Sequence, residues 1–425
     1  MSPLFGPILA QLVTMGIADR TEARYIDSDG RYAEAATMPR VGLNFGWQHA
    51  SLTLGYGPSI TVTPLDSTPR DVLVFHAGAL AASYRFQRTT VSVAESIGYG
   101  QVSFQDQALA PAVGTATTTT TGQTPPGGAV QTPPGGTMPG GTGTTGTGVM
   151  TPAGGTLAAN QVRALNQVVT FITSATTLSV ANAVSAVLTV SGDIGYIETG
   201  SIGPQRDPVD YPLIRGPRAQ VSARYRIAPH DDLSTTVSTQ FANASTGDRS
   251  WYLVANESYA HAIDRETKTN VGTGLSISRN ALADGLISYS IYPTFNAGIS
   301  NVSRLWRGTF MLQTTVTAAP VIDPVRAVVD PQLGVSGTTG WGKDKFSSVL
   351  AAGTALSLLD PSSTGALSSA TGSFTLGYRL DPSWSVNTGV RGAWQNYEGQ
   401  TTIPWSYALF LGVSFGAVLP LNGGI

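Results

Sequence analysis

The stretch Ser51-Leu-Thr-Leu-Gly-Tyr-Gly-Pro-Ser-Ile-Thr-Val-Thr63 alternates apolar residues with small polar ones. Side chains of a β-strand point to opposite faces in turn, so one face carries the apolar set Leu52, Leu54, Tyr56, Ile60 and Val62. The other face carries only Gly, Ser and Thr, where a soluble sheet would normally carry Lys, Glu or Asp. An apolar face opposite a small, uncharged polar face is typical of a wall between lipid and water, as in a transmembrane β-barrel.

The composition of the whole chain favours the same class. Charged residues make up 12% of its 425 residues, against about 25% in soluble domains. No apolar run reaches the roughly 20 residues of a membrane-spanning helix, which excludes a helical membrane protein. The chain has no cysteine, as suits an exported protein, and its net charge of -2 gives no reason to expect a nucleic-acid partner.

The chain is expected to contain a short leader and one domain. Pro3 to Met15 is mostly apolar, and Gly16-Ile17-Ala18 has the small-x-small pattern of a signal-peptidase site. Residues 1–18 are therefore predicted to be a secretory signal, with a short buried segment as the alternative. Residues 19–425 are predicted to form a single β-barrel domain.

Turn signals set the expected number of strands. Short turns are predicted at 49–50, 87–88, 176–177, 228–232, 264–265, 301–303, 340–345 and 381–382. Longer loops fall between them, around 64–72, 105–162, 197–217, 244–249, 279–285, 320–326, 359–368 and 396–403. Short turns on one rim and long loops on the other indicate an antiparallel barrel of about eighteen strands, with sixteen as the alternative. The first strand is expected near Ala23 to Tyr32, and Val162 to Ser174 fits either a strand or a loop helix.

Aromatic residues gather where such strands would meet the membrane interface. One set lies close to short turns on the lipid-facing side of its strands: Tyr84, Phe86, Tyr225, Trp306, Tyr378 and Trp384. Trp394 and Trp405 mark the opposite rim. Interfacial aromatic girdles of this kind flank the apolar band of membrane barrels.

The strand from Trp405 to Phe415 resembles the C-terminal recognition strand of outer-membrane β-barrel proteins. Its outward alternation is Tyr407, Leu409, Leu411, Val413 and Phe415, with Gly412 facing inward. The resemblance implies a bacterial outer-membrane location, contact with outer-membrane lipid, and folding by the outer-membrane barrel assembly machinery. Residues 416–425 follow this strand, whereas the family's strand usually ends the chain.

A low-complexity segment interrupts the barrel pattern. From Ala110 to Gly155 the chain is nearly all Thr, Gly, Pro and Ala, and Gln123 to Gly128 is repeated as Gln131 to Gly136. Such a sequence has too little apolar surface to offset the entropy lost on ordering. Residues 105–162 are therefore predicted to be one long disordered extracellular loop. It could serve as an adhesive, glycosylated or gating tether, or be an expanded loop without a role of its own.

The charged residues inside strands favour a channel over an enzyme. The four histidines show no catalytic or metal-binding spacing, so no enzyme, metal site or cofactor is expected. Strand alternation instead turns a basic set toward the lumen near the short turns: Arg85, Arg226, Lys268, Arg307 and Arg379. Arg224 and Arg391 extend this positive charge along the wall, whereas Asp193 and Asp330 are the chief inward acids expected.

Such a ring would attract anions, although the arginines could instead pair with loop carboxylates and stiffen the barrel. Glu95 and Glu257 fall on the lipid face, unless a β-bulge turns them inward. In strand number and basic lumen the chain resembles exopolysaccharide secretion barrels of the alginate type. This resemblance implies an outer-membrane pore for anionic cargo. Its most specific form is the export of an anionic polysaccharide, with periplasmic export components as partners. The alternatives are a general diffusion porin with a loop folded inside, and a surface-structural or adhesive barrel.

Overall fold

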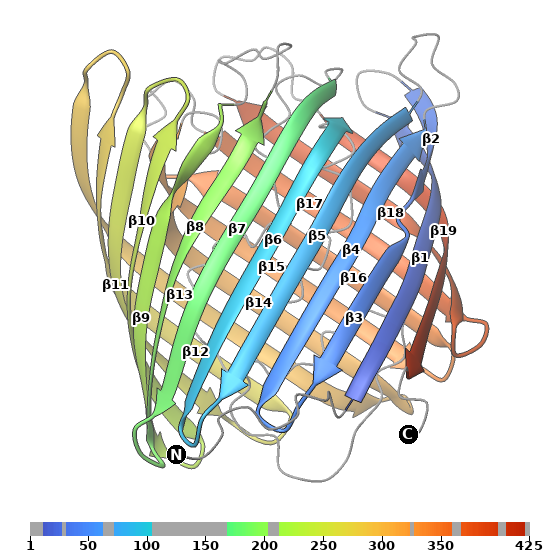
Figure 1. Ribbon diagram of the computed structural model, residues 1–425, viewed down its shortest axis with the longest axis horizontal. Coiled ribbons are helices and arrows are strands. Elements are labelled where there is room, and N and C mark those ends of the chain that lie inside the picture. Colours follow the sequence, from blue (N-terminus) through green and yellow to red (C-terminus); the bar gives the residue numbers. More distant parts are fainter. Residues whose placement is uncertain are drawn as a thin grey trace, which may run out of the picture.

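The computed structural model describes residues 12–27, 31–62, 72–103, 168–202, 212–323, 327–358, 367–397 and 405–420 (Figure 1). These residues form one antiparallel sheet that closes into a barrel. Its strands are β1 (Leu12–Asp27), β2 (Arg31–Thr37), β3 (Arg40–Gly46), β4 (Ala50–Val62), β5 (Val72–Arg85), β6 (Thr89–Ser103), β7 (Val168–Ala183), β8 (Leu188–Ser201), β9 (Ile214–Ala228), β10 (Asp231–Ala244), β11 (Arg249–Ala262), β12 (Thr267–Ala281), β13 (Ile287–Leu305), β14 (Gly308–Ile322), β15 (Val329–Lys343), β16 (Phe346–Ser357), β17 (Leu367–Arg379), β18 (Trp384–Tyr397) and β19 (Trp405–Pro420).

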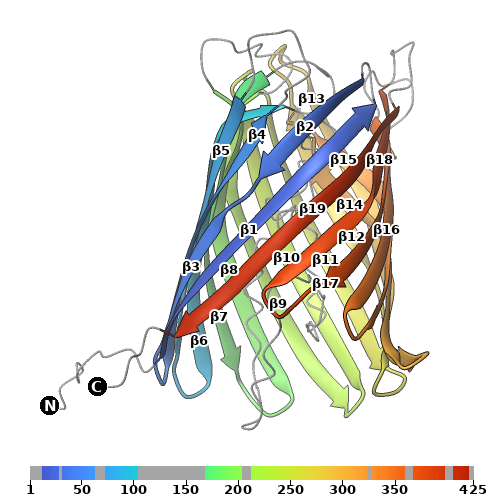
Figure 2. The same cartoon turned by 90° about the vertical axis from the view of Figure 1, so that its right-hand side faces the viewer.

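Two of these segments, β2 and β3, are halves of one strand of the wall. Both pair with β1 on one side and β4 on the other, and the register runs on without a shift between them. The interruption falls at Met38–Pro39, because proline has no N–H to donate to the ladder. The wall therefore has eighteen strand positions, as the larger of the two expected counts predicted. Pairing of β1 with β19 closes it (Figure 2).

The first strand begins earlier than expected. It was predicted near Ala23 to Tyr32, but β1 runs from Leu12 to Asp27. Its lower half, up to Ala18, pairs with β3 and with the end of β19. A cut after Ala18 would remove that half of the wall strand. The signal segment 1–18 stays a prediction, and residues 1–11 lie outside the described part of the chain.

The connections follow the expected asymmetry, with short turns at the lower rim of Figure 1. Two predicted turns were wrong. Thr176–Thr177 lies inside β7, and the turn comes at 184–187, where the Ser185 hydroxyl accepts hydrogen bonds from the N–H groups of Val187 and Leu188. The turn expected at 301–303 comes instead at Trp306 and Arg307, whose φ values of 50° and 62° fit a two-residue hairpin turn.

The start of β7 is a strand rather than a loop helix. Val168 to Ser174 is strand, whereas a loop helix was the competing interpretation of Val162 to Ser174. The low-complexity loop 105–162 lies outside the described residues. No helix in the described ranges is long and apolar enough to cross a membrane.

Large apolar side chains cover the outer face of the wall. Near the short-turn rim Tyr84, Tyr225, Tyr378 and Trp384 are between 37% and 49% exposed on this face, as the girdle interpretation predicted. The Trp384 ring packs on Phe415 with centroids 4.9 Å apart. At the opposite rim the Trp394 and Trp405 centroids lie 6.1 Å apart. Trp306 departs from the expectation, because it lies in the β13–β14 turn rather than on a strand face.

Candidate functional site: the barrel lumen

Small polar side chains line much of the inner wall. On β10 to β13 the inward positions include Ser238, Ser276, Ser278 and Thr294, all buried. Their hydroxyl oxygens have no hydrogen-bond partner among the described residues. This part of the inner wall therefore carries small polar side chains in place of large apolar ones, with these four hydroxyl groups buried.

The connection between β14 and β15 folds into the lumen. We call residues 321–323 and 327–331 the β14–β15 tip. Ala327 packs in a buried apolar cluster with Ile214 of β9 and Ala242 of β10. Val329 packs in a second cluster with Tyr252 and Val254 of β11. These partners are inward-facing residues of strands beyond β12, so the tip reaches across the inner wall and narrows the passage on its long-loop side.

Hydrogen bonds fix the tip to the wall. The side-chain amide of Asn280 on β12 accepts a bond from the Val329 N–H at 2.7 Å and donates one to the Val329 carbonyl at 3.3 Å. The buried carboxylate of Asp330 accepts bonds from the Ser357 hydroxyl at 2.7 Å and from the Gln332 amide at 3.1 Å. Asp330 was expected only as an inward acid. The structure shows that it anchors the tip.

A basic ring occupies the short-turn mouth, and we define it as Arg85, Arg226, Lys268, Arg304 and Arg379. Strand alternation turns all five inward, at the short-turn ends of β5, β9, β12, β13 and β17. All five are exposed. Arg379 donates to the Asp344 carbonyl at 3.3 Å.

One member of the ring was missed and one expected member lies elsewhere. Arg307 is the second residue of the β13–β14 turn, with a positive φ, so it does not follow strand alternation. Arg304 holds the inward position instead, because the turn lies farther along the chain than predicted. The alternation of β13 would have indicated Arg304 had the turn been placed correctly.

An acid inside the mouth lowers the local positive charge. Arg224 forms an ion pair with Asp232, Nη2 to Oδ2 at 2.5 Å, and Arg226 Nε lies 3.8 Å from Asp232 Oδ1. The sequence placed Asp232 in a turn, but β10 begins one residue before it. Arg224 therefore contributes little free charge, whereas Arg226 is 55% exposed.

Arg391 is not a free lumenal cation either. Its Nη2 lies 3.2 Å from Glu22 Oε1, and its Cζ lies 4.0 Å from the centre of the Phe410 ring. Glu22 also pairs with Arg20 and, at 3.0 Å, with Arg24, which bonds Glu34 at 2.8 Å. This cluster joins β18, β1 and β2 across the closing strand β19. It was missed because the first strand was placed too late in the chain.

The two outward acids keep their predicted face. The ladders on both sides of Glu95 and Glu257 run without a register shift, so the proposed β-bulge is wrong. Both side chains are exposed on the outer surface. They therefore do not cancel the lumenal charge. Asp193 faces inward on β8, as expected.

The closing strand follows the expected alternation. Tyr407, Leu409, Leu411 and Val413 are 40% to 57% exposed on the outer face. Gly412 faces inward, directly opposite Glu22. The strand does not stop at Phe415, because residues 416–420 continue the pairing with β1. No group of His, Cys, Asp or Glu in the described ranges could hold a metal ion.

Several solved protein structures are similar to this chain. Among them, OpdO of Pseudomonas aeruginosa is similar at 12% identity over 97% of this chain and 98% of its own, with a TM-score of 0.47. OpdK of Pseudomonas aeruginosa is similar at 11% identity over 97% of this chain and 100% of its own, with a TM-score of 0.45. OccAB4 of Acinetobacter baumannii is similar at 8% identity over 97% of this chain and 100% of its own, with a TM-score of 0.44. No curated protein sequence matches the chain.

A family profile matches most of the chain. It is that of the EpsX exopolysaccharide export family, and it covers residues 135–419, which is 285 of the 425 residues. The match takes in every wall strand from β7 to β18 and nearly all of β19. With its lipid-facing outer wall and polar lumen, this chain is an outer-membrane β-barrel channel and belongs to the EpsX exopolysaccharide export family.

Proposed function

We propose that this channel exports an anionic exopolysaccharide from the periplasm to the cell surface. The observation that carries the proposal is the basic ring, which places five cations on five separate strands around one mouth. A ring of one sign at an aqueous entrance concentrates solutes of the opposite sign and repels others. On the short-turn, periplasmic side it would attract an acidic polymer before the polymer enters the lumen.

The inner wall suits a sugar polymer in its chemistry. Inward side chains that are not buried, such as Thr315, Ser336 and Gln313 on β14 and β15, offer hydrogen bonds without a fixed charge beyond the mouth. A polymer rich in hydroxyl groups can exchange such bonds as it moves. Because each contact is weak and repeated, the cargo can enter favourably and still leave.

Ion selectivity tests the charge of the ring. In planar bilayers under a salt gradient, the wild-type reversal potential should indicate anion preference. The variant Arg85→Glu/Arg226→Glu/Arg304→Glu/Arg379→Glu should shift toward cations. The shift should grow at low salt, since the screening length rises from about 10 Å at 0.1 M to about 30 Å at 0.01 M. A matched control is Arg88→Glu/Arg265→Glu/Arg307→Glu/Lys345→Glu, which reverses four charges only in the turns. Cation selectivity of the wild type would refute anionic cargo.

Surface polysaccharide tests the export itself. A strain lacking the gene should lose cell-surface exopolysaccharide, and wild-type protein should restore it. The ring variant should restore much less, while the turn variant should restore it fully. A normal amount of cell-surface polysaccharide in the deletion strain would exclude the export role. It would not affect the conclusion that the protein is an outer-membrane channel.

A general diffusion porin is the second candidate, and the β14–β15 tip favours it. A segment folded into the lumen narrows a passage to the size of small solutes. This candidate predicts conductance and small-solute uptake with unchanged polysaccharide in the deletion strain. The adhesive alternative depends on the low-complexity loop, which lies outside the described residues.

A further inference from the structure

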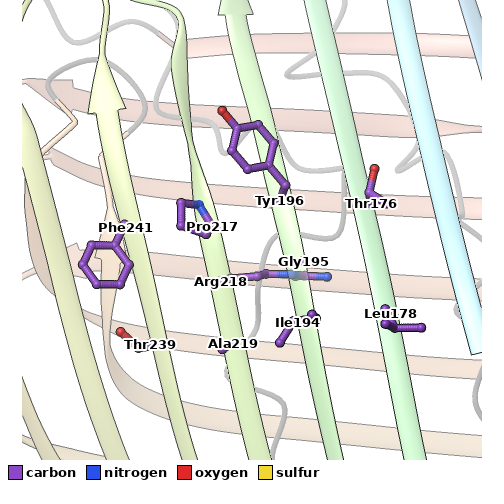
Figure 3. Close-up of a pocket in the computed structure, with 10 residues that line it drawn as sticks. All are labelled: Thr176, Leu178, Ile194, Gly195, Tyr196, Pro217, Arg218, Ala219, Thr239 and Phe241. Atoms are coloured by element: carbon purple, nitrogen blue, oxygen red, sulfur yellow. The ribbon is translucent and has the colours of Figure 1, made fainter.

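The outer wall carries an apolar groove on β7 to β10, in the extracellular half of the membrane-facing surface. It is bounded by Leu178, Ile194, Tyr196 and Phe241, with Pro217 and Ala219 between them. Figure 3 shows the Phe241 and Tyr196 rings on either side of Pro217. The groove exists because β9 presents two small outward residues between strands with large ones. Its volume is about 440 Å³.

The backbone hydrogen bonding beneath the groove is also interrupted, at Pro217 of β9. Tyr196 is the cross-strand neighbour of Pro217 on β8. On the other side, the β9–β10 ladder is interrupted opposite Pro217 and resumes at the pair Arg215 and Asn243. Proline has no N–H for the ladder, so the groove is built into the wall by the sequence of β9.

Outward arginines lie just above the groove. Arg215 is two residues from Pro217, toward the extracellular rim, and shares the outward parity of Val221 and Tyr225. Arg249 faces outward on β11, in the same cross-strand row through Asn243. Both arginines are exposed. Two strand spacings place their Cα atoms about 10 Å apart.

Aromatic side chains fix the depth of this row. Phe241 and Trp251 are cross-strand partners with ring centroids 6.3 Å apart, one step below Asn243 and Arg249. Aromatic belts mark the boundary between hydrocarbon and headgroups. The arginines therefore lie at the level of lipid headgroups, directly over an apolar groove at acyl-chain depth.

Extension of two arginine side chains to the aqueous interface does not by itself explain this arrangement. Long basic side chains near a strand end do extend to the interface on their own. That behaviour does not require a groove beneath them. Glu198 is the outward cross-strand neighbour of Arg215, and the structure shows no ion pair between the two in the described ranges. Arg215 is thus available to an anion.

We propose that this face is a binding site for a phosphorylated, acylated glycolipid of the outer leaflet. One acyl chain fills the groove between Tyr196 and Phe241, and headgroup phosphate contacts Arg215 and Arg249. Charge complementarity selects the occupant, because the groove takes hydrocarbon and the row above it takes an anion. The site is separate from the lumen and does not depend on the proposed cargo.

Binding of diphosphoryl lipid A to the purified barrel in detergent tests the site. Native mass spectrometry should show one lipid bound by wild type. Arg215→Gln/Arg249→Gln should weaken binding about 25-fold, at roughly fivefold for each basic residue beside an anionic headgroup. Lipid A stripped of its phosphates should bind wild type as weakly. A matched charge control, Arg88→Gln/Arg265→Gln in the β5–β6 and β11–β12 turns, should bind as wild type does.

Filling the groove tests the acyl part. Ala219→Trp should abolish the bound lipid, whereas Ala82→Trp, the same change on the outward face of β5, should leave it. Ala219→Leu gives a milder second variant, and heat-dependent gel migration confirms that each barrel is closed. Equal lipid binding by all variants, or equal binding of lipid A with and without phosphates, would overturn the proposal.

Discussion

Gly412 on β19 lies directly opposite Glu22 on β1, and a side chain at Gly412 would occupy the space that Glu22 now fills. A Cβ there would stand 2.9 Å from Glu22 Cγ and 3.1 Å from the Thr21 carbonyl oxygen. The missing side chain lets Arg391 reach across the closing strand to Glu22. The charged cluster at the seam thus depends on a glycine that the assembly-strand pattern also singled out.

Gly412→Val should destabilise the barrel by about 3 kcal/mol, the cost of separating one partner from a buried ion pair. Glu22→Gln should have a similar effect, because it leaves Arg20, Arg24 and Arg391 close together. Urea unfolding in lipid vesicles measures both. Gly392→Val is the control, since a Cβ there would meet nothing nearer than 3.8 Å. Equal stability of all three variants and wild type would show that the cluster does not hold the seam.

The purified protein should migrate at different positions on a denaturing gel before and after boiling. Only a closed barrel satisfies every strand-edge hydrogen bond in lipid, and such a barrel resists detergent until heated. A single position at all temperatures, together with solubility in the absence of detergent, would contradict the closed membrane barrel.

Asn280→Ala should raise the single-channel conductance. The change removes both side-chain hydrogen bonds to Val329 and weakens the attachment of the β14–β15 tip to β12. Asn270→Ala is the matched control, because Asn270 faces inward on the same strand near the opposite rim. Unchanged conductance in Asn280→Ala would mean that the Asp330 hydrogen bonds and the apolar contacts of Ala327 and Val329 hold the tip without Asn280.

Replacing the outward acids should stabilise the barrel. Glu95 and Glu257 face lipid near the middle of their strands, where a charged side chain is unfavourable. Each Glu→Gln change should raise the free energy of unfolding on the order of 1 kcal/mol. Glu266→Gln, in the β11–β12 turn, should leave stability unchanged. A loss of stability at either strand position would show that the carboxylate contacts a partner in the membrane.

The architecture was predictable because period-two alternation repeats in most strands, so eighteen positions could be counted from it and the turn signals without knowing any contact. The lumenal charge was only partly predictable. A turn misplaced by a few residues put Arg307 in the ring in place of Arg304, and a first strand placed too late hid Glu22. The β14–β15 tip could not be predicted, because its position depends on contacts between Ala327 and Ile214, more than a hundred residues apart in sequence.

The pairing of β1 with β19 also determines the order in which the strands pair during folding. Every other strand of the wall pairs with a neighbour along the chain, whereas Thr14 pairs with Pro420. Closing a loop of that length costs far more chain entropy than forming a hairpin, so the seam should form last. Until the final strand is in place, the nascent sheet has two long unpaired edges. We propose that a template covers these edges during that interval, in which case the folding rate should depend on how quickly the template is released.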